Sequence, residues 1–222
     1  RGGSDHSATA VANLIDADKV ILWKDVPGIY SINPRWGIRS ETIPYLNYQE
    51  AIELSLMDTP VLHPSTIEPL IEPNIQMEVR HLYHSNHDEK TVIGPELPEK
   101  ELKAVGCLPN VISLGFSHHH IDSHQRQLVK ILGELAKNEV HWWGLESRLG
   151  DSRLIVSQHD MHRASAIFEQ FNIDANHHQH LGLLSLIGCK ESDVETINTL
   201  FNETEFELSW LNQTSAAARV AI

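Results

Sequence analysis

The second half of the chain shows the same order of predicted elements twice, and this repeat constrains the fold more than any other feature. The first copy is a strand, a helix, a hairpin and a helix, at 110–116, 122–138, 140–157 and 161–171. The second copy is a strand, a helix and two strands, at 183–188, 193–201, 205–211 and 217–222. Such an order predicts two ferredoxin-like α+β units. The second copy ends before its second helix, so we expect the C-terminus to be cut short.

The first part of the chain alternates helix and strand patterns. Helices are predicted at 7–17, 48–57 and 65–71, and strands at 19–23 and 75–82. Asn47 and Glu50 have the spacing of a capping box at the start of the second helix. This alternation predicts an α/β layer structure. Gly94, Pro95 and Pro98 break the pattern, so the predicted organisation is an α/β part at 1–95, a linker and leading strand at 96–109, and ferredoxin-like units at 110–181 and 182–222.

Charge and composition exclude several classes of function. The chain carries 17 basic and 30 acidic residues and a formal net charge of −13, which argues against general nucleic-acid binding and against docking on anionic membranes. No run of about 20 apolar residues exists to cross a bilayer, and no signal peptide is visible. Cys107 and Cys189 are isolated thiols, as expected of a reduced, cytoplasmic protein.

The first five residues, Arg1 to Asp5, open a predicted helix. Free backbone N–H groups at a helix N-terminus attract anions, and two glycines allow a ligand to approach the backbone. Arg1 suits a carboxylate or phosphate, while Ser4 and Asp5 suit the polar groups of an amino acid. The same residues also fit a capped helix after a tight turn. Because the chain opens without an initiator Met, we expect it to be a fragment of a longer one.

Three further polar residues follow the first predicted strand. Asp25, Tyr30 and Arg35 surround a Pro-Gly turn, and ligands of open α/β sheets bind beyond the carboxyl ends of the strands. Asp25 suits a nucleotide or a metal ion, and Arg35 suits a phosphate. The alternative is an ordinary loop with an Asp turn cap and an exposed Arg.

Histidines are abundant, with 15 in the chain; one cluster is 118–120 together with His124, and the other lies within 177–180. Zinc, copper or nickel sites need three converging ligands. Neighbouring residues of a strand point to opposite faces, so we expect surface or loop histidines and no metal site. A histidine-rich metal-binding protein remains the weakest alternative. Trp142 and Trp143 are predicted to pack in the core or an interface.

Together, the motifs of residues 1 to about 93 resemble the aspartokinases. They comprise Arg1 to Asp5, the Trp-Lys-Asp-Val-Pro-Gly-Ile-Tyr run at 23–30, Asn-Pro-Arg at 33–35, and the segments at 48–51 and 61–69. The repeat that follows resembles the tandem ACT regulatory domains of that family by topology and position. The resemblance therefore implies the C-terminal, nucleotide-binding part of an amino-acid kinase fold, followed by two ACT units.

The resemblance also implies an activity and a set of site residues. The family transfers the γ-phosphoryl group of ATP, with Mg²⁺, to the side-chain carboxylate of L-aspartate, the first step toward lysine, threonine and methionine. Residues that match its substrate-binding segment are Arg1, Ser4 and Asp5. Residues that match its ATP contacts are Lys24, Asp25, Tyr30 and Arg35. No catalytic residue is identified, because the family's N-terminal Lys-Phe-Gly-Gly segment is absent from this sequence.

The chain departs from the family pattern at several positions. Lys24 stands where many members have Thr, and Pro60 stands where many have a Lys that contacts nucleotide. The effector segment lacks the usual Gly; the residues there are His120, Asp122 and Ser123. Trp142 and Trp143 stand where a Val-Asp pair is frequent, and their rings predict weakened feedback by lysine or threonine.

Two functions follow from this comparison. The first is an aspartate kinase fragment, inactive alone, that forms homodimers or higher oligomers through its ACT units. The second is a non-catalytic, ACT-bearing regulatory polypeptide that acts through a partner or an effector. The upstream reading frame distinguishes them.

Overall fold

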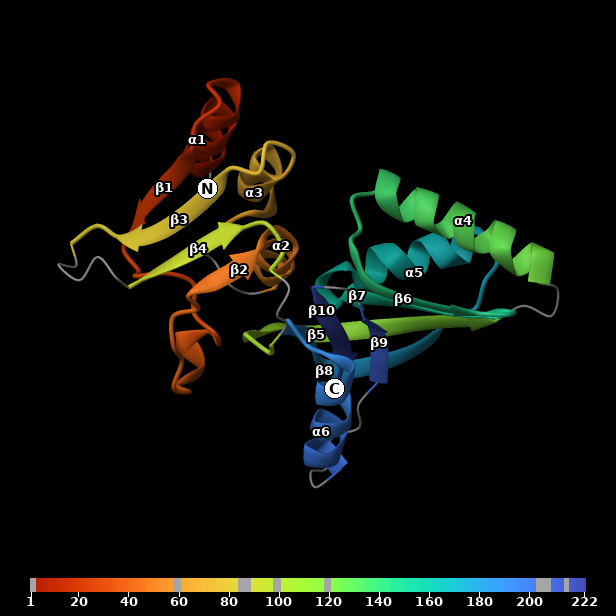
Figure 1. Cartoon of the computed structure of the whole chain (residues 1–222). Coiled ribbons are helices and arrows are strands. Elements are labelled where there is room, and N and C mark those ends of the chain that lie inside the picture. The colour runs from red at the N-terminus through yellow and green to blue at the C-terminus, as the bar shows by residue number, and fades with distance from the viewer. Residues whose placement is uncertain are drawn as a thin grey trace. The chain divides into compact units, whose positions relative to one another are not determined.

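The computed structural model describes residues 3–57, 61–83, 89–97, 101–117, 121–202, 209–213 and 216–222. The chain separates into two compact units (Figure 1). The first unit comprises Arg1–Cys107, Ser185–Leu200 and Gln213–Ala218, and the second comprises Leu108–Leu184, Phe201–Asn212 and Arg219–Ile222. Both mix helices with sheet, which confirms the predicted fold class.

The first unit contains a four-stranded mixed sheet in the order β1-β3-β4-β2. Its strands are β1 (Lys19–Lys24), β2 (Tyr45–Asn47), β3 (Gln76–His81) and β4 (Lys90–Gly94). β1 runs parallel to β3, β2 runs parallel to β4, and β3 and β4 are antiparallel. Strands β1 and β3 were predicted from sequence. β2 was missed because it has only three residues, and β4 because it leads into the Gly-Pro pair that was interpreted as a boundary.

Three helices share a core with one face of this sheet. They are α1 (Gly3–Leu14), α2 (Tyr48–Leu56) and α3 (Pro64–Ile71). Met77 and Val79 of β3 are fully buried in that core together with Ile67 of α3. Because side chains alternate along a strand, Glu78 and Arg80 lie on the opposite face. The capping box of α2 is present: Asn47 Oδ1 accepts from the Glu50 N–H, and Glu50 accepts from the Asn47 N–H.

The second unit begins with a β-α-β-β-α-β order. Its elements are β5 (Ala104–Ser117), α4 (Ile121–Lys137), β6 (Trp142–Arg148), β7 (Asp151–Ser157), α5 (Met161–Gln170) and β8 (Asn176–Ile187). The strand order β6-β7-β5-β8 is that of a ferredoxin-like sheet. Phe116, Leu135 and Phe168 join β5, α4 and α5 in one buried cluster. The predicted hairpin is confirmed, with Gly150 in the left-handed conformation at its turn.

The remaining elements repeat half of this arrangement. They are α6 (Glu191–Asn202), β9 (Ser209–Gln213) and β10 (Ala217–Ala221), and the order β8-β10-β9 mirrors β5-β7-β6. The first strand of the second repeat was predicted to begin at Leu183, and this start is wrong. The strand, β8, begins at Asn176 and also closes the first ferredoxin-like sheet. The stretch at 177–180 is polar, which hid the strand from a hydrophobicity pattern. Residues 203–208, where we predicted the start of a strand, lie outside the described residues.

No helix in the part of the chain that the structure describes is long and apolar enough to cross a membrane. Cys189 is a buried thiol. Burial raises the pKa of the Cys189 thiol, and the nearby Asp193 carboxylate raises it further.

Candidate functional site

The start of α1 meets the carboxyl end of β1. Asp5, in the first turn of α1, forms an ion pair with Lys24, the last residue of β1, with 2.5 Å between Oδ2 and Nζ. Both side chains are largely buried, at 16% and 22% exposure. Ser4 lies exposed in the same turn of the helix, and Arg1 lies outside the described residues. The structure therefore joins one predicted substrate residue to one predicted ATP residue.

The start of α3 lies beside the start of α1. His6 donates from Nδ1 to the carbonyl oxygen of Ser65 over 2.7 Å. His63 caps α3, and Pro64 occupies its first turn, where its missing N–H costs nothing. Two helix N-termini, each with a partial positive charge, are thus held together next to Lys24. Such a place favours an anionic ligand. His6 and Ser65 could not be predicted from local sequence, because their contact joins positions 59 residues apart.

The loop that follows β1 is held at Ile29 and at Ile43 by Thr91 of β4. The buried hydroxyl of Thr91 accepts from the Ile29 N–H over 2.8 Å and donates to the Ile43 carbonyl over 2.7 Å. A Cβ at Gly28 would lie 2.5 Å from both Thr42 Cγ2 and Thr91 Oγ1, so only glycine fits there without a shift. The loop that carries the predicted ATP residues is therefore anchored to the sheet.

The predicted ATP residues take different places in this loop. Asp25 is exposed directly after β1. Tyr30 pairs with Thr42 in an isolated bridge, and Arg35 is exposed in a single 3-10 turn (Pro34–Trp36) that Asn33 caps. Among the described residues, no hydrogen bond or ion pair joins Tyr30 or Arg35 to the Asp5–Lys24 pair.

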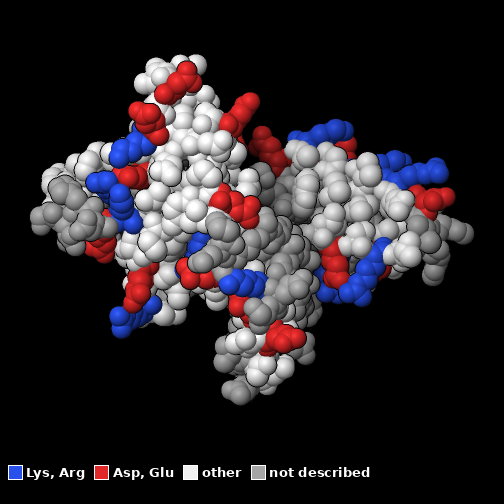
Figure 2. Space-filling view, in the orientation of Figure 1, with Lys and Arg blue, Asp and Glu red and all other residues white. Residues whose placement is uncertain are grey.

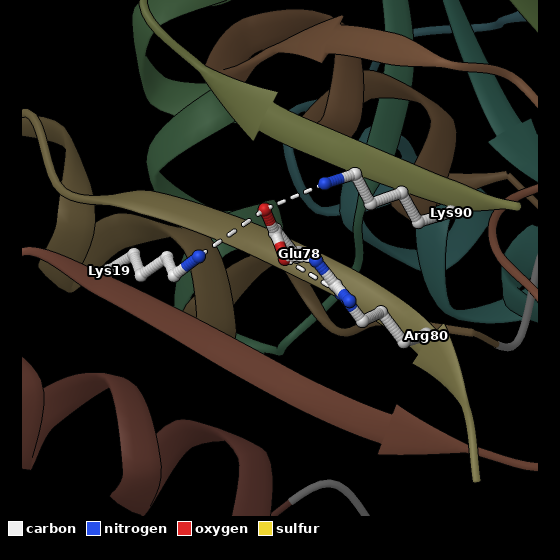
Figure 3. Close-up of polar contacts among 4 residues, drawn as sticks. All are labelled: Lys19, Glu78, Arg80 and Lys90. Atoms are coloured by element: carbon white, nitrogen blue, oxygen red, sulfur yellow. Dashed lines mark hydrogen bonds and ion pairs between the residues drawn. The ribbon is translucent and has the colours of Figure 1, made fainter. Parts of the chain in front are cut away.

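A second polar cluster lies on the face of the sheet opposite the helices. Glu78 of β3 is 7% exposed and contacts three cations (Figure 3). Arg80 Nε lies 2.7 Å from the carboxylate, Lys90 Nζ of β4 lies 3.0 Å from it, and Lys19 Nζ of β1 lies 3.8 Å from it. A buried carboxylate without such partners would be strongly unfavourable. The cluster therefore ties β1, β3 and β4 together.

These cations also determine the ionisation of Glu78. Burial alone would raise the pKa of the carboxyl group, but the hydrogen bonds from Lys90 and Arg80 and the charges of both side chains outweigh burial and lower the pKa. Glu78 is thus held in its charged form. No local pattern predicts this cluster, because Lys19, Glu78 and Lys90 are far apart in the chain and only the strand order brings them together.

In the second unit, two predicted effector residues lie at the start of α4. Asp122 is exposed and Ser123 is half-buried, while His120 lies outside the described residues. The next residue, His124, is buried with its Nε2 atom 2.8 Å from Ser152 Oγ on β7. Ser152 donates onward to Ser147 over 2.9 Å. The expectation of a surface or loop histidine is therefore wrong at His124, because this side of α4 packs on the sheet against Phe116.

His180 of β8 is buried as well, again unlike the expected surface histidines. Its Nε2 atom lies 3.1 Å from Ser113 Oγ, and its ring packs against His178. Burial lowers its pKa, and the nearby His178 and Arg153 lower it further. Within the described ranges, no three His, Cys, Asp or Glu side chains gather as metal ligands.

The two neighbouring tryptophans, which are predicted to pack in the core or an interface, differ in their burial. Trp142 is 36% exposed, whereas Trp143 is half-buried at a bulge of the β6–β7 pair. The guanidinium of Arg219 donates to the Trp143 carbonyl.

On the face shown in Figure 2, basic and acidic side chains are interspersed over the described atoms and do not form a single basic stripe.

Comparison with known proteins shows what this chain is similar to. Residues 1–81 match the model of the amino acid kinase family. The bifunctional aspartokinase/homoserine dehydrogenase of Haemophilus influenzae is 40% identical over 118 residues, which are 53% of this chain and 14% of that protein. The equivalent protein of Buchnera aphidicola is 25% identical over 85% of this chain and 24% of its own length.

Solved structures match along the whole chain. The aspartate kinase of Clostridium acetobutylicum has a TM-score of 0.84 and 21% identity over 100% of this chain and 54% of its own. Aspartokinase III of Escherichia coli, solved with aspartate and ADP, has a TM-score of 0.80 and 23% identity over 100% of this chain and 52% of its own. The chain thus spans about half of these structures and a quarter or less of the curated relatives. In sequence over its first part, and in fold along its whole length, the chain is similar to the aspartokinases.

Proposed function

We propose that this chain is the C-terminal portion of an ATP-dependent aspartate kinase that forms 4-phospho-L-aspartate and is inactive alone. The observation that carries the proposal is the Asp5–Lys24 pair, placed where two helix N-termini meet the end of β1. A protein of similar fold has been solved with aspartate and ADP. Phosphoryl transfer from ATP depends more on charged groups that position the reactants than on covalent chemistry by the protein.

Each side chain has a proposed role. Arg1, Ser4 and Asp5 bind L-aspartate, and Lys24, Asp25, Tyr30 and Arg35 bind ATP. Asp25 has an exposed carboxylate without an ion-pair partner among the described residues, whereas that of Asp5 is taken by Lys24. Asp25 therefore fits Mg²⁺, which prefers oxygen ligands and would neutralise the phosphates of the bound nucleotide.

The remaining parts of the proposal concern regulation and organisation. Residues 1–95 form the kinase part and 96–109 the linker, with ACT-like units at 110–181 and 182–222. His120, Asp122 and Ser123 contribute to an effector site. The aspartokinase III structure solved with lysine supports an amino-acid effector. Pairing of ACT units gives a homodimer or higher oligomer, and the location is cytoplasmic.

The test compares this chain with the longer polypeptide encoded together with its upstream reading frame. Each is incubated with L-aspartate, ATP and Mg²⁺, and the acyl phosphate is trapped as a hydroxamate. Product from the longer polypeptide but not from this chain supports the proposal. Product insensitive to lysine and threonine also supports the predicted weakening of feedback, and strong inhibition by either amino acid contradicts it.

The second candidate is a non-catalytic regulatory polypeptide. Pro60, which lies outside the described residues, favours it, because proline has neither the charge nor the N–H of the lysine common in the family. Absence of product from the longer polypeptide, with recovery in its Pro60→Lys variant, would establish this candidate and overturn the first.

A further inference from the structure

The first unit contains a cavity of about 970 Å³ that lies apart from the Asp5–Lys24 pair. One wall is the end of the loop that leads into β2. The other wall is the segment that leads into β5, together with Lys190, which directly precedes α6. Its charged and aromatic lining consists of Arg39, Glu41, Tyr45, Glu101, Lys103 and Lys190. This volume lies in the range of small-molecule sites.

The second wall is held in place by buried contacts. The Lys103 side chain is 10% exposed, and its ammonium lies 2.8 Å from the Glu50 carboxylate, which is itself 2% exposed. The Lys103 N–H donates to the carbonyl of Ile187 over 2.8 Å. Gly188 has a positive φ and lies so close to the Glu101 carbonyl that a Cβ would be 2.0 Å from that oxygen. The cavity is therefore preformed.

The charges of the lining balance. Lys103 is neutralised by Glu50, and Arg39 pairs with Glu41 over 3.1 Å. That second pair is 89% and 74% exposed, so it is weak and open to exchange. Glu101 and Lys190 are exposed, and neither side chain has an ion-pair partner among the described residues. Within the described lining, the cavity thus offers one unpaired cation and one unpaired anion, which matches a zwitterion and opposes a polyanion such as a nucleotide.

Apolar groups line the rest of the cavity. Leu97 and Leu102 are 47% and 45% exposed, and the ring of Tyr45 is fixed by the hydrogen bond from its hydroxyl to the Pro95 carbonyl over 2.7 Å. An aromatic ring packs favourably against such a surface. We propose that this cavity binds an α-amino acid with an aromatic side chain, with its carboxylate at Lys190 and its ammonium at Glu101.

The test is calorimetric titration of the chain with L-phenylalanine, 3-phenylpropionate and phenethylamine. The latter two lack the ammonium and the carboxylate respectively. We expect saturable binding of phenylalanine with a Kd near or below about 1 mM, and at least about tenfold weaker binding of each analogue. Because no kinase activity is required, this test is independent of the proposed function.

Variants locate the site. Lys190→Glu and Glu101→Gln are each expected to weaken phenylalanine binding at least about tenfold, since each removes one charged contact. Lys130→Glu, an exposed change on α4 in the second unit, should leave binding unchanged. Failure of phenylalanine to bind, binding of either analogue as tight as that of phenylalanine, preferential binding of ATP, or unchanged binding in Lys190→Glu would each overturn the proposal.

Discussion

Replacing Glu78 by Gln should destabilise the first unit, because the cluster around this carboxylate spans three strands. Glu78 accepts hydrogen bonds from Arg80 at 2.7 Å and Lys90 at 3.0 Å, and hydrogen bonds to charged groups contribute roughly 1.5–3 kcal/mol each. Lys19 is 3.8 Å away on a side chain that is 50% exposed, so its contribution is small. Gln retains one acceptor, and the cations regain some water. We therefore expect a loss of about 2–3 kcal/mol.

The assay is hydrogen exchange followed by mass spectrometry on peptides from β1, β3 and β4, because a local readout avoids mixing the unfolding of two units. The matched control is Glu41→Gln, which removes an exposed carboxylate that is also paired with an arginine. This control should change the free energy of opening by less than about 0.5 kcal/mol. Equal small effects of Glu78→Gln and Glu41→Gln would refute the reasoning.

The same carboxylate gives a pH dependence of defined sign. The pKa of Glu78 is lower in the folded state than in the unfolded chain. Its contribution to the free energy of unfolding is therefore complete above the ordinary glutamate pKa of about 4.3 and is lost as the pH falls through the lower folded value. Glu78→Gln should reduce the slope of stability against pH in this acidic range.

Further predictions concern three glycine positions and one histidine. Gly28→Ala should cost about 1–3 kcal/mol, measured by exchange of the loop after β1, because its Cβ meets Thr42 and Thr91 at 2.5 Å. Gly188→Ala should cost more, by the same method on β8 peptides, because strain at φ +76° adds to the clash. Gly133→Ala should instead stabilise α4, because the added Cβ meets no atom within 4 Å and alanine favours a helix over glycine. Similar effects of the three glycine substitutions would contradict this account. The pKa of His180 is lowered by folding, so the second unit should lose stability as the pH falls below about 6.5, and His180→Asn should lose that dependence in unfolding measured between pH 5 and 8.

Local patterns predicted the elements that have strong local signals. The capping box at Asn47 and the alternation around Met77 and Val79 gave α2 and β3 nearly to their ends. The same approach missed β2 and β4. β2 has only three residues, which is too few to show a periodicity. β4 runs directly into Gly94 and Pro95, which local patterns interpret as a break between elements. β8 began earlier than predicted, because its first residues are polar and are ordered by pairing within the sheet.

The candidate site was predictable only as separate motifs. The identity of Asp5 and Lys24 was visible in the sequence, but their ion pair depends on how α1 packs beside β1. The contact of His6 with Ser65 and the burial of His124 depend on helix packing in the same way. The cluster at Glu78 requires the strand order β1-β3-β4, which no local pattern contains.

The most direct test of the central claim is a comparison of two aspartate variants in the longer polypeptide. Asp5→Asn removes the charge at the junction of α1 and β1, whereas Asp18→Asn removes an exposed charge just before β1. With hydroxamate trapping of the acyl phosphate, we predict that Asp5→Asn lowers kcat/KM for aspartate by at least about tenfold and that Asp18→Asn retains wild-type activity. Wild-type activity in Asp5→Asn would contradict the account.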